Sequence, residues 1–171
     1  MGDIWEGYFL MSEVLIGLGG NVGDVCSVFD EAIEWMGLYV FGICRSRTIR
    51  TKPVYDKPGC VVPVVADPDY WNAVVRGRTG HSPRALLGYL QGIECLLGRV
   101  PGGNCERRPI DLDILMVDDV VLTTCALVLP HPRLHTRLFV LELVSEIAGD
   151  WVHPIFGLTL GELYLRSVSL A

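Results

Sequence analysis

Two aspartates separated by one residue are the feature of the sequence that points most directly to chemistry. Asp111 and Asp113 lie in the apolar segment 110–117, which reads IDLDILMV. Side chains alternate across a strand, so both carboxylates would project from one face while Leu112 and Ile114 fill the other. Carboxylates this close repel each other unless a cation lies between them, and magnesium commonly binds such groups together with substrate phosphates. The pattern indicates either a magnesium-dependent nucleotide site or an edge strand with two solvated aspartates.

A glycine-containing loop precedes this segment and carries arginines at both of its ends. Arg107 and Arg108 directly precede the segment, and Arg99 lies at the other end of the loop 99–109. A planar guanidinium group matches the oxygens of a phosphate, so an anionic ligand bound with magnesium would satisfy both kinds of charge. Surface ion pairs with the aspartates are the alternative, and such pairs contribute little to stability. The sequence leaves both interpretations open.

Other catalytic motifs are incomplete. The turn 17–23 reads GLGGNVG, but its sixth position is Val22 rather than glycine, which disfavours a dinucleotide-binding oxidoreductase and favours a tight turn with close backbone approach. His131 and His135 have the spacing of a helical zinc pair, yet Pro132 separates them and the accompanying glutamate is missing. His131 is therefore interpreted as a loop residue. The sequence also has no GxSxG elbow and no identifiable cysteine nucleophile, which disfavours covalent catalysis.

Length and charge exclude several classes of protein. The chain has 171 residues and a mass of 18.9 kDa, enough for one domain with a full core. Its net charge of -6 and pI of about 5.1 argue against a protein that coats nucleic acid or an acidic membrane. No uninterrupted apolar run is long enough to span a bilayer. We expect a soluble protein with neither nucleic acid nor membrane as its partner.

The termini and cysteines suggest a compartment and a domain layout. Residues 1–12 lack the basic and apolar segments of a signal, so they are interpreted as an N-terminal extension, with 13–171 as a single domain. The six cysteines form no CxxC pair, which favours reduced thiols in the cytoplasm. Cys44 and Cys95 lie in apolar stretches, and we predict that they are small core residues.

The periodicity of apolar residues predicts alternating strands and helices. Expected strands span 13–18, 38–49, 70–75 and 110–117, and expected helices span 22–36, 82–97 and 136–148. A long loop covers 51–68, and loops of that length are often functional. The order predicts an α+β fold with a ferredoxin-like βαββαβ core, in which an antiparallel sheet carries helices on one face and a C-terminal helical extension follows.

Several segments occur in the order and spacing of one enzyme family. They are LIGLGGNVGD (15–24), RTKPV (50–54), DPDYWNAVV (67–75), GIECLLGR (92–99), RPIDLDILMVDD (108–119), LPHPRLHTRLFVLELVSEIA (129–148) and HPIFGLTLGEL (153–163). Over about residues 14–163 the chain resembles the 6-hydroxymethyl-7,8-dihydropterin pyrophosphokinase family of folate biosynthesis. The combination of RPIDLDIL with PHPRLHTRLF is the most specific part of the resemblance.

The resemblance implies a magnesium-dependent transferase. Its substrates would be ATP and 6-hydroxymethyl-7,8-dihydropterin, and its products AMP and the pterin diphosphate. Asp111 and Asp113 match the family's magnesium ligands, and two Mg²⁺ ions are expected with ATP. Phosphoryl-type transfer depends mainly on positioning and electrostatic stabilisation, so no dedicated protein base is required. Family members are commonly monomeric or fused to other folate enzymes, and a cytoplasmic monomer is expected here.

The same resemblance assigns the remaining site residues. The expected catalytic group comprises Arg99, Arg108, Asp111 and Asp113. Residues on the nucleotide side are Gln91, Arg99, Arg108, Ile114, His131 and Arg137, and residues around the pterin are Thr51, Val54, Tyr70, Asn72 and Phe139. Glu94 matches a site position to which no role is assigned. Without the resemblance, Tyr70 and Phe139 would be read as ordinary core residues.

The chain departs from the family pattern in its catalytic loop. Residues 99–108 read RVPGGNCERR, whereas the family usually reads like RVRxxRWGPR, so the central arginines and the tryptophan are missing. Lys52 stands where the family has a small residue or proline, and Ala126 and Val128 differ on the nucleotide side. Loop closure expels water and assembles such sites. These differences leave an alternative open, a weakened paralogue that binds pterin or nucleotide as a sensor or partner protein.

Overall fold

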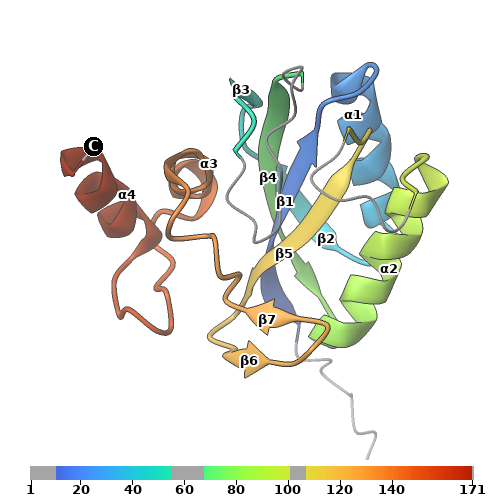
Figure 1. Ribbon diagram of the computed structural model, residues 1–171. Coiled ribbons are helices and arrows are strands. Elements are labelled where there is room, and N and C mark those ends of the chain that lie inside the picture. Colours follow the sequence, from blue (N-terminus) through green and yellow to red (C-terminus); the bar gives the residue numbers. More distant parts are fainter. Residues whose placement is uncertain (1–10, 55–67, 101–106, 171) are drawn as a thin grey trace, which may run out of the picture.

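The central element of the protein is a five-stranded antiparallel sheet (Figure 1). The structure is a computed structural model that describes residues 11–54, 68–100 and 107–170. Its strands are β1 (Ser12–Gly20), β2 (Phe41–Arg45), β3 (Ile49–Thr51), β4 (Tyr70–Thr79) and β5 (Asp111–Val117). The order across the sheet is β2-β4-β1-β5, with β3 also pairing with β4. This is the order of a ferredoxin-like sheet, so the predicted fold class is confirmed.

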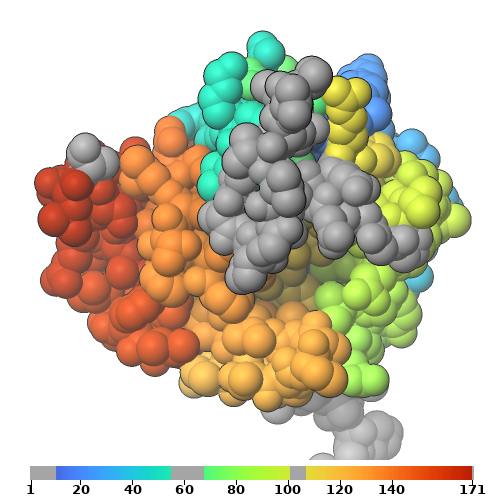
Figure 2. All heavy atoms as spheres, in the orientation of Figure 1, coloured from blue at the N-terminus to red at the C-terminus, as the bar shows by residue number. Residues whose placement is uncertain are grey.

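Helices cover both faces of the sheet. On one face, α1 (Val25–Met36) and α2 (Pro83–Leu96) bury residues such as Phe29 and Leu90 against β1, β4 and β5. On the other, α3 (Leu138–Ala148) and α4 (Leu160–Ser169) bury a second cluster with Leu15 and Val74. The helices of the βαββαβ unit therefore share one face as predicted, whereas the C-terminal pair forms the opposite flank, orange and red in Figure 2. Within the described residues, none of the helices has the length and apolarity needed to cross a bilayer.

Polar caps set where three of the helices begin. The Asp24 carboxylate accepts the Ser27 N–H, which starts α1 at Val25 rather than at the predicted residue 22. Ser82 caps α2 in the same way, with proline at the first helical position as the sequence predicts. Thr159 and Glu162 form a reciprocal capping box at the start of α4. Each cap satisfies backbone donors that would otherwise have no partner within the helix.

Two predicted strand boundaries differ from the structure. The expected strand 38–49 is divided into β2 and β3, and β4 continues to Thr79 instead of ending at 75. The charged sequence RGRT (76–79) lies beyond the predicted strand, but it pairs with β1 along its whole length. Gly77 lets Val40, directly before β2, pack against this part of β4, because a Cβ there would lie 2.4 Å from Cγ1 of Val40. A short ladder of β6 (Leu122–Thr123) and β7 (Val128–Leu129) was not predicted.

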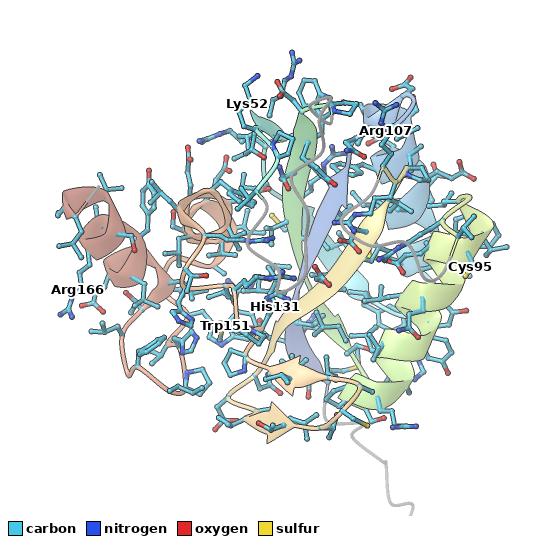
Figure 3. The ribbon with its side chains drawn as sticks, viewed as in Figure 1. Lys52, Cys95, Arg107, His131, Trp151 and Arg166 are labelled. Atoms are coloured by element: carbon cyan, nitrogen blue, oxygen red, sulfur yellow. The ribbon has the colours of Figure 1, made fainter. Side chains whose placement is uncertain are left out.

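The prediction that Cys44 and Cys95 are core residues is wrong, because both are exposed. Cys44 lies on β2 at the edge of the sheet, where most side chains are accessible. Cys95 follows the buried residues Ile93 and Glu94 on α2, and one step along the helix turns it to the outer side (Figure 3). Cys26 and Cys125 are also free thiols, while Cys60 and Cys105 lie outside the described residues.

A bulge separates the two ends of β5. Gly19 pairs with Asp111 and Gly17 with Asp113, after which Ile16 pairs with Ile114 and Leu15 with Met116. Leu115 is therefore the extra residue on β5. Leu112 and Ile114 face α1 and α2, whereas Leu115 and Met116 both join the cluster beneath α3. The aspartate end of β5 is left to line a pocket.

Candidate active site

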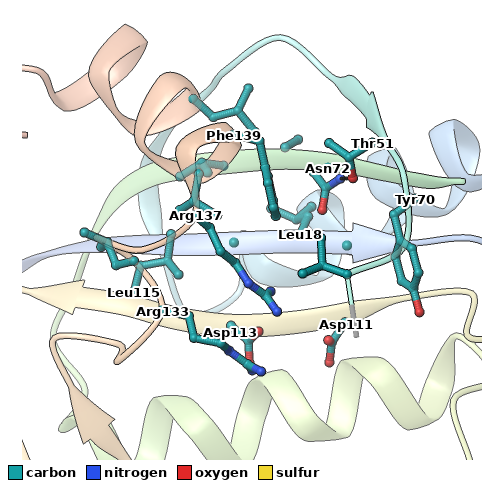
Figure 4. A pocket seen from close by; sticks show the side chains of 18 of the residues that line it. Leu18, Thr51, Tyr70, Asn72, Asp111, Asp113, Leu115, Arg133, Arg137 and Phe139 are labelled. Atoms are coloured by element: carbon teal, nitrogen blue, oxygen red, sulfur yellow. Dashed lines mark hydrogen bonds between the residues drawn. The ribbon is translucent and has the colours of Figure 1, made fainter. Parts of the chain in front are cut away.

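The floor of the pocket is a hollow in the sheet. Asn72, Gly19 and Asp111 lie opposite one another on β4, β1 and β5, and Gly17 lies opposite Asp113 in the next row. Directly paired residues share a face of the sheet, so the glycines leave open space between the amide and the carboxylates. A Cβ on Gly19 would lie 3.7 Å from Oδ1 of Asn72 and 3.8 Å from Cβ of Asp111. It would stand between Asn72 and Asp111, which are both labelled in Figure 4.

The walls come from three other parts of the chain. The end of β3 and the residues after it form one side, the start of α3 closes another, and the segment before α3 completes the pocket (Figure 4). Residues predicted for the site that line this pocket are Thr51, Val54, Tyr70, Asn72, Arg108, Asp111, Asp113, His131, Arg137 and Phe139. Segments more than 80 residues apart in sequence thus converge as the resemblance requires.

One side of the pocket, formed by Thr51, Tyr70, Asn72 and Phe139, is here termed the aromatic side. Nδ2 of Asn72 donates a hydrogen bond to Oγ1 of Thr51 at 2.9 Å. The guanidinium of Arg137 lies 5.9 Å from the Phe139 ring centroid, within cation–π range. Tyr70 and Phe139 are only partly buried and face the pocket, which favours the ligand-binding interpretation over core packing.

The opposite side is lined by Arg108, Asp111 and Asp113, and Arg99 joins it through an ion pair with Asp111; these four residues are termed the charged side. Asp111 pairs with Nη1 of Arg99 at 2.6 Å and with Nη2 of Arg108 at 3.0 Å. Its side chain is 15% exposed, so although β5 is an edge strand, Asp111 is not a solvated surface residue. Asp113 lines the same face, and Arg133 and Arg137 point toward it (Figure 4). Opposite charges are therefore concentrated at one end of the pocket.

Glu94 is a buried carboxyl behind the charged side. It lies on α2 and is 5% exposed. Burial raises its pKa to about 7, and the Leu112 N–H and the Arg99 guanidinium oppose that rise. The pKa of Arg99 is in turn held above its ordinary value, because the charges of Asp111 and Glu94 outweigh the effect of burial. Arg99 thus reaches the pocket through Asp111 although it is not itself part of the wall.

His131 is fixed by two backbone contacts at the pocket edge. Its main-chain N–H donates to the carbonyl oxygen of Leu115 at 2.8 Å, and its Nδ1 accepts the Arg133 N–H at 3.1 Å. Burial lowers the pKa of its imidazole, so the ring is neutral at pH 7. The prediction that His131 belongs to a loop agrees with its position before α3.

Two residues predicted for the nucleotide side lie away from the pocket wall. The side chain of Ile114 is 2% exposed and packs in the core with α1 and α2. Gln91 lies on an exposed part of α2. A role for Ile114 in binding would therefore fall to its main chain on the edge strand, and Gln91 would have to meet a ligand that extends beyond the pocket.

Sequence reasoning missed Asn21, which holds the end of the loop 99–108. The Asn21 N–H donates to the Arg108 carbonyl at 3.0 Å, and the Arg108 N–H donates to Oδ1 of Asn21 at 2.9 Å. Gly20 allows this contact, because a Cβ there would lie 2.4 Å from the Pro109 carbonyl oxygen. The expected close backbone approach is therefore confirmed at Gly20. The only signal in the sequence is an asparagine directly after the glycines.

The donor set suits magnesium bound together with an anionic ligand. Two carboxylates share one face of the pocket, and among the described residues no group of three or more His, Cys, Asp and Glu side chains is placed to hold a metal. Magnesium usually has few protein carboxylates and completes its shell with water and substrate phosphates. In the described part of the chain, Nε of Arg108, which lines the pocket, is a buried donor without a hydrogen-bond partner. Such a donor suits a phosphate oxygen.

Comparison with known proteins identifies relatives along most of the chain. The family model described as 7,8-dihydro-6-hydroxymethylpterin-pyrophosphokinase matches residues 15–149. The 2-amino-4-hydroxy-6-hydroxymethyldihydropteridine pyrophosphokinase of Synechocystis is 37% identical over 149 residues, which cover 87% of this chain and 73% of that protein. The folic acid synthesis protein fol1 of Pneumocystis carinii is 35% identical over 156 residues, covering 91% of this chain.

The relatives differ greatly in length. This chain spans 20% of the Pneumocystis protein and 24% of the mitochondrial folate synthesis bifunctional protein of Arabidopsis thaliana. Among solved structures, wild-type HPPK-DHPS of Plasmodium falciparum with pteroate matches with a TM-score of 0.74 at 14% identity. That match covers 93% of this chain and 45% of the Plasmodium chain. At this identity it supports the fold.

Proposed function

Because the chain belongs to the 7,8-dihydro-6-hydroxymethylpterin-pyrophosphokinase family, we propose that it transfers the diphosphate of ATP to 6-hydroxymethyl-7,8-dihydropterin in folate biosynthesis. The products would be AMP and the pterin diphosphate. The observation that supports this most strongly is the arrangement of one pocket, in which Asn72 and Asp111 face each other across Gly19. A heterocycle bound on the aromatic side would present its substituent to the charged side.

The aromatic side is suited to a flat ring with hydrogen-bonding edges. Phe139 would stack on the pterin, and the Asn72 amide would bind the donors and acceptors of its edge. A site that pairs polar groups with a ligand rejects analogues that leave those groups unpaired. Oγ1 of Thr51 orients the amide by accepting a hydrogen bond from Nδ2 of Asn72, and Tyr70 and Val54 would border the ring.

On the charged side, the aspartates and arginines would bind the phosphates. Asp111 and Asp113 would hold magnesium, with two ions present when ATP is bound. Magnesium supplies charge neutralisation on the transferring phosphates and fixes their orientation. Arg99, Arg108 and Arg137 would contact phosphate oxygens, and the neutral imidazole of His131 would lie beside them.

The chemistry that follows is an in-line displacement at the β-phosphorus of ATP. The hydroxymethyl oxygen attacks as the bond to AMP breaks, and the hydroxyl proton leaves to solvent. Most of the catalysis comes from holding the two substrates in line and from stabilising negative charge in the transition state. The pocket would bring the two substrates together, so its residues would act through position and charge.

The proposal extends to the remaining nucleotide contacts and to the state of the protein. Gln91 and the main chain of Ile114 would meet the adenosine part of ATP. We expect residues 13–171 to act as one pyrophosphokinase domain, as a monomer in the cytoplasm. Free thiols at the described cysteines agree with a reducing compartment. Neither the family model nor the relatives named above point to the alternative of a sensor paralogue.

The proposed function is tested by measuring AMP formation from ATP and the dihydropterin with magnesium, using wild type and an Asp111→Ala, Asp113→Ala variant. Wild type should form AMP only when the pterin is present, and the variant should form none above background. Circular dichroism confirms that the variant folds. Silence of the wild type, with the pterin still bound, would refute the transferase function and support the sensor paralogue.

A further inference from the structure

Arg99 reaches the charged side from the end of α2, and a buried carboxylate on that helix holds it there. Its main-chain N–H donates to the Glu94 carbonyl oxygen at 2.9 Å, and its guanidinium donates to Oε1 of Glu94. Glu94 is 5% exposed, whereas the side chain of Arg99 is 28% exposed. The glutamate is thus the fixed member of the pair, and the arginine is the member that can reach a ligand.

Oε1 of Glu94 also binds the strand that carries the aspartates. It accepts the main-chain N–H of Leu112 at 2.6 Å. Leu112 lies between Asp111 and Asp113 on an edge strand, where a buried N–H without a partner would be costly. One oxygen therefore fixes both the strand between the two aspartates and the arginine beside them.

Asp111 has competing partners once an anionic ligand and magnesium arrive. In the structure, one of its oxygens binds Arg99 and the other binds Arg108. A cation held by this carboxylate would repel both guanidinium groups, and the phosphates would attract them. Arg108 would remain in place through its backbone bonds to Asn21. For Arg99, the side-chain contact that remains in the described structure is the one to Glu94.

We propose that Glu94 is a positioning residue that keeps Arg99 at the charged side when Asp111 releases it to bind phosphate. This inference rests on the proposed diphosphate transfer. It gives Glu94 a role distinct from joining α2 to β5, because an amide at this position would still accept the Leu112 N–H but would not attract the arginine by charge.

The test compares Glu94→Gln with wild type at pH 8.5, where a carboxyl with a pKa of about 7 is ionised, and uses Glu13→Gln as the matched control. Glu13 also pairs with an arginine on the sheet, since Arg76 lies 2.8 Å from its carboxylate, but it lies at the other end of β1 and outside the pocket. A charge-assisted hydrogen bond is roughly twice as strong as a neutral one. We expect Glu94→Gln to raise the Kd of a non-hydrolysable ATP analogue with magnesium by about tenfold, and to lower kcat similarly. Affinity for the dihydropterin alone and the Tm should change little.

A double-mutant cycle with Arg99→Ala shows whether Glu94 acts through the arginine. In the Arg99→Ala background, Glu94→Gln should change the analogue Kd by less than about twofold. An equal loss in both backgrounds would overturn the inference, as would a matching loss in Glu13→Gln or wild-type behaviour of Glu94→Gln. Glu94→Leu removes the acceptor as well and should lower the Tm. If wild type itself forms no AMP, the proposed function fails, whereas the binding cycle still tests the role of Glu94.

Discussion

The aromatic and charged sides of the pocket differ in how complete their contacts are before any ligand binds. On the aromatic side, the Asn72 amide is already bonded to Thr51, and the ring of Phe139 already has the Arg137 guanidinium within cation–π range. On the charged side, Asp111 is shared by two arginines that a phosphate would also attract. The aromatic side is therefore a preformed surface, whereas the charged side must exchange ionic partners when a phosphate binds. Under the proposed function, recognition of the ring and transfer of the diphosphate are therefore separable by experiment.

Removing magnesium is expected to give the largest difference between the two sides, with a large loss of diphosphate transfer and little change in pterin binding. Chelation with EDTA should lower AMP formation by about 10³-fold or more, because the aspartates then have no cation with which to neutralise the phosphates. Binding of the dihydropterin alone, measured by isothermal titration calorimetry, should stay within about twofold. Restoring magnesium is the control. A parallel loss of pterin binding would show that the two sides are not independent.

A change on the aromatic side should weaken pterin binding and leave nucleotide binding almost unchanged. Phe139→Ala should raise the Kd of the dihydropterin by about 10- to 100-fold, because the aromatic face on which the pterin would stack is lost. Phe139→Leu keeps most of the side-chain volume but has no aromatic face, so its Kd for the dihydropterin should lie between those of wild type and Phe139→Ala. The ATP analogue with magnesium should bind almost as in wild type, as measured by calorimetry. A larger effect on the nucleotide than on the pterin would contradict the division of the pocket.

Two adjacent glycines on β1 allow ligand binding at the pocket floor to be tested separately from the stability of the fold. Gly19→Ala meets no atom closer than 3.7 Å, so the free energy of unfolding should change little while the pterin Kd rises by about tenfold. Gly20→Ala would place a Cβ 2.4 Å from the Pro109 carbonyl oxygen. It should lower the free energy of unfolding by about 1–3 kcal/mol. Urea denaturation and pterin titration of both variants check the contrast, and equal stability losses would contradict it.

The smallest effect is expected far from the pocket, at the capping box of α4. Thr159→Ala should lower the free energy of unfolding by about 1 kcal/mol and leave the affinity for both substrates unchanged. Hydrogen bonds from the Thr159 main chain and hydroxyl lower the pKa of Glu162 below 4.5. Its contribution to stability is therefore complete above pH 4.5 and is lost as the pH falls through the folded-state pKa. Urea denaturation at pH 7 and at pH 3 should show a smaller difference between wild type and variant at the lower pH.

Local patterns predicted most of the fold and the centre of the site. Alternation placed Asp111 and Asp113 on one face, and helical spacing identified α1 to α3 within a few residues. The contacts that hold the site together were not predictable in this way. Asn21 meets Arg108 across 87 residues, and no local pattern encodes that hydrogen bond. Glu94 looks like an ordinary charged position on an amphipathic helix, and its burial depends on how β5 packs beside α2.

The bulge at Leu115 has a consequence for the accuracy of folding. A strand that slips by one residue turns all its side chains to the other face of the sheet. For β5, such a slip would direct Asp111 and Asp113 into the core beneath α1 and α2, and would expose Leu112 and Ile114 to the pocket. In the observed alignment with β1, the extra residue lets Leu115 and Met116 both reach the cluster under α3. The bulge thus helps to specify the register of β5, and with it the face of the sheet on which the two acidic side chains lie.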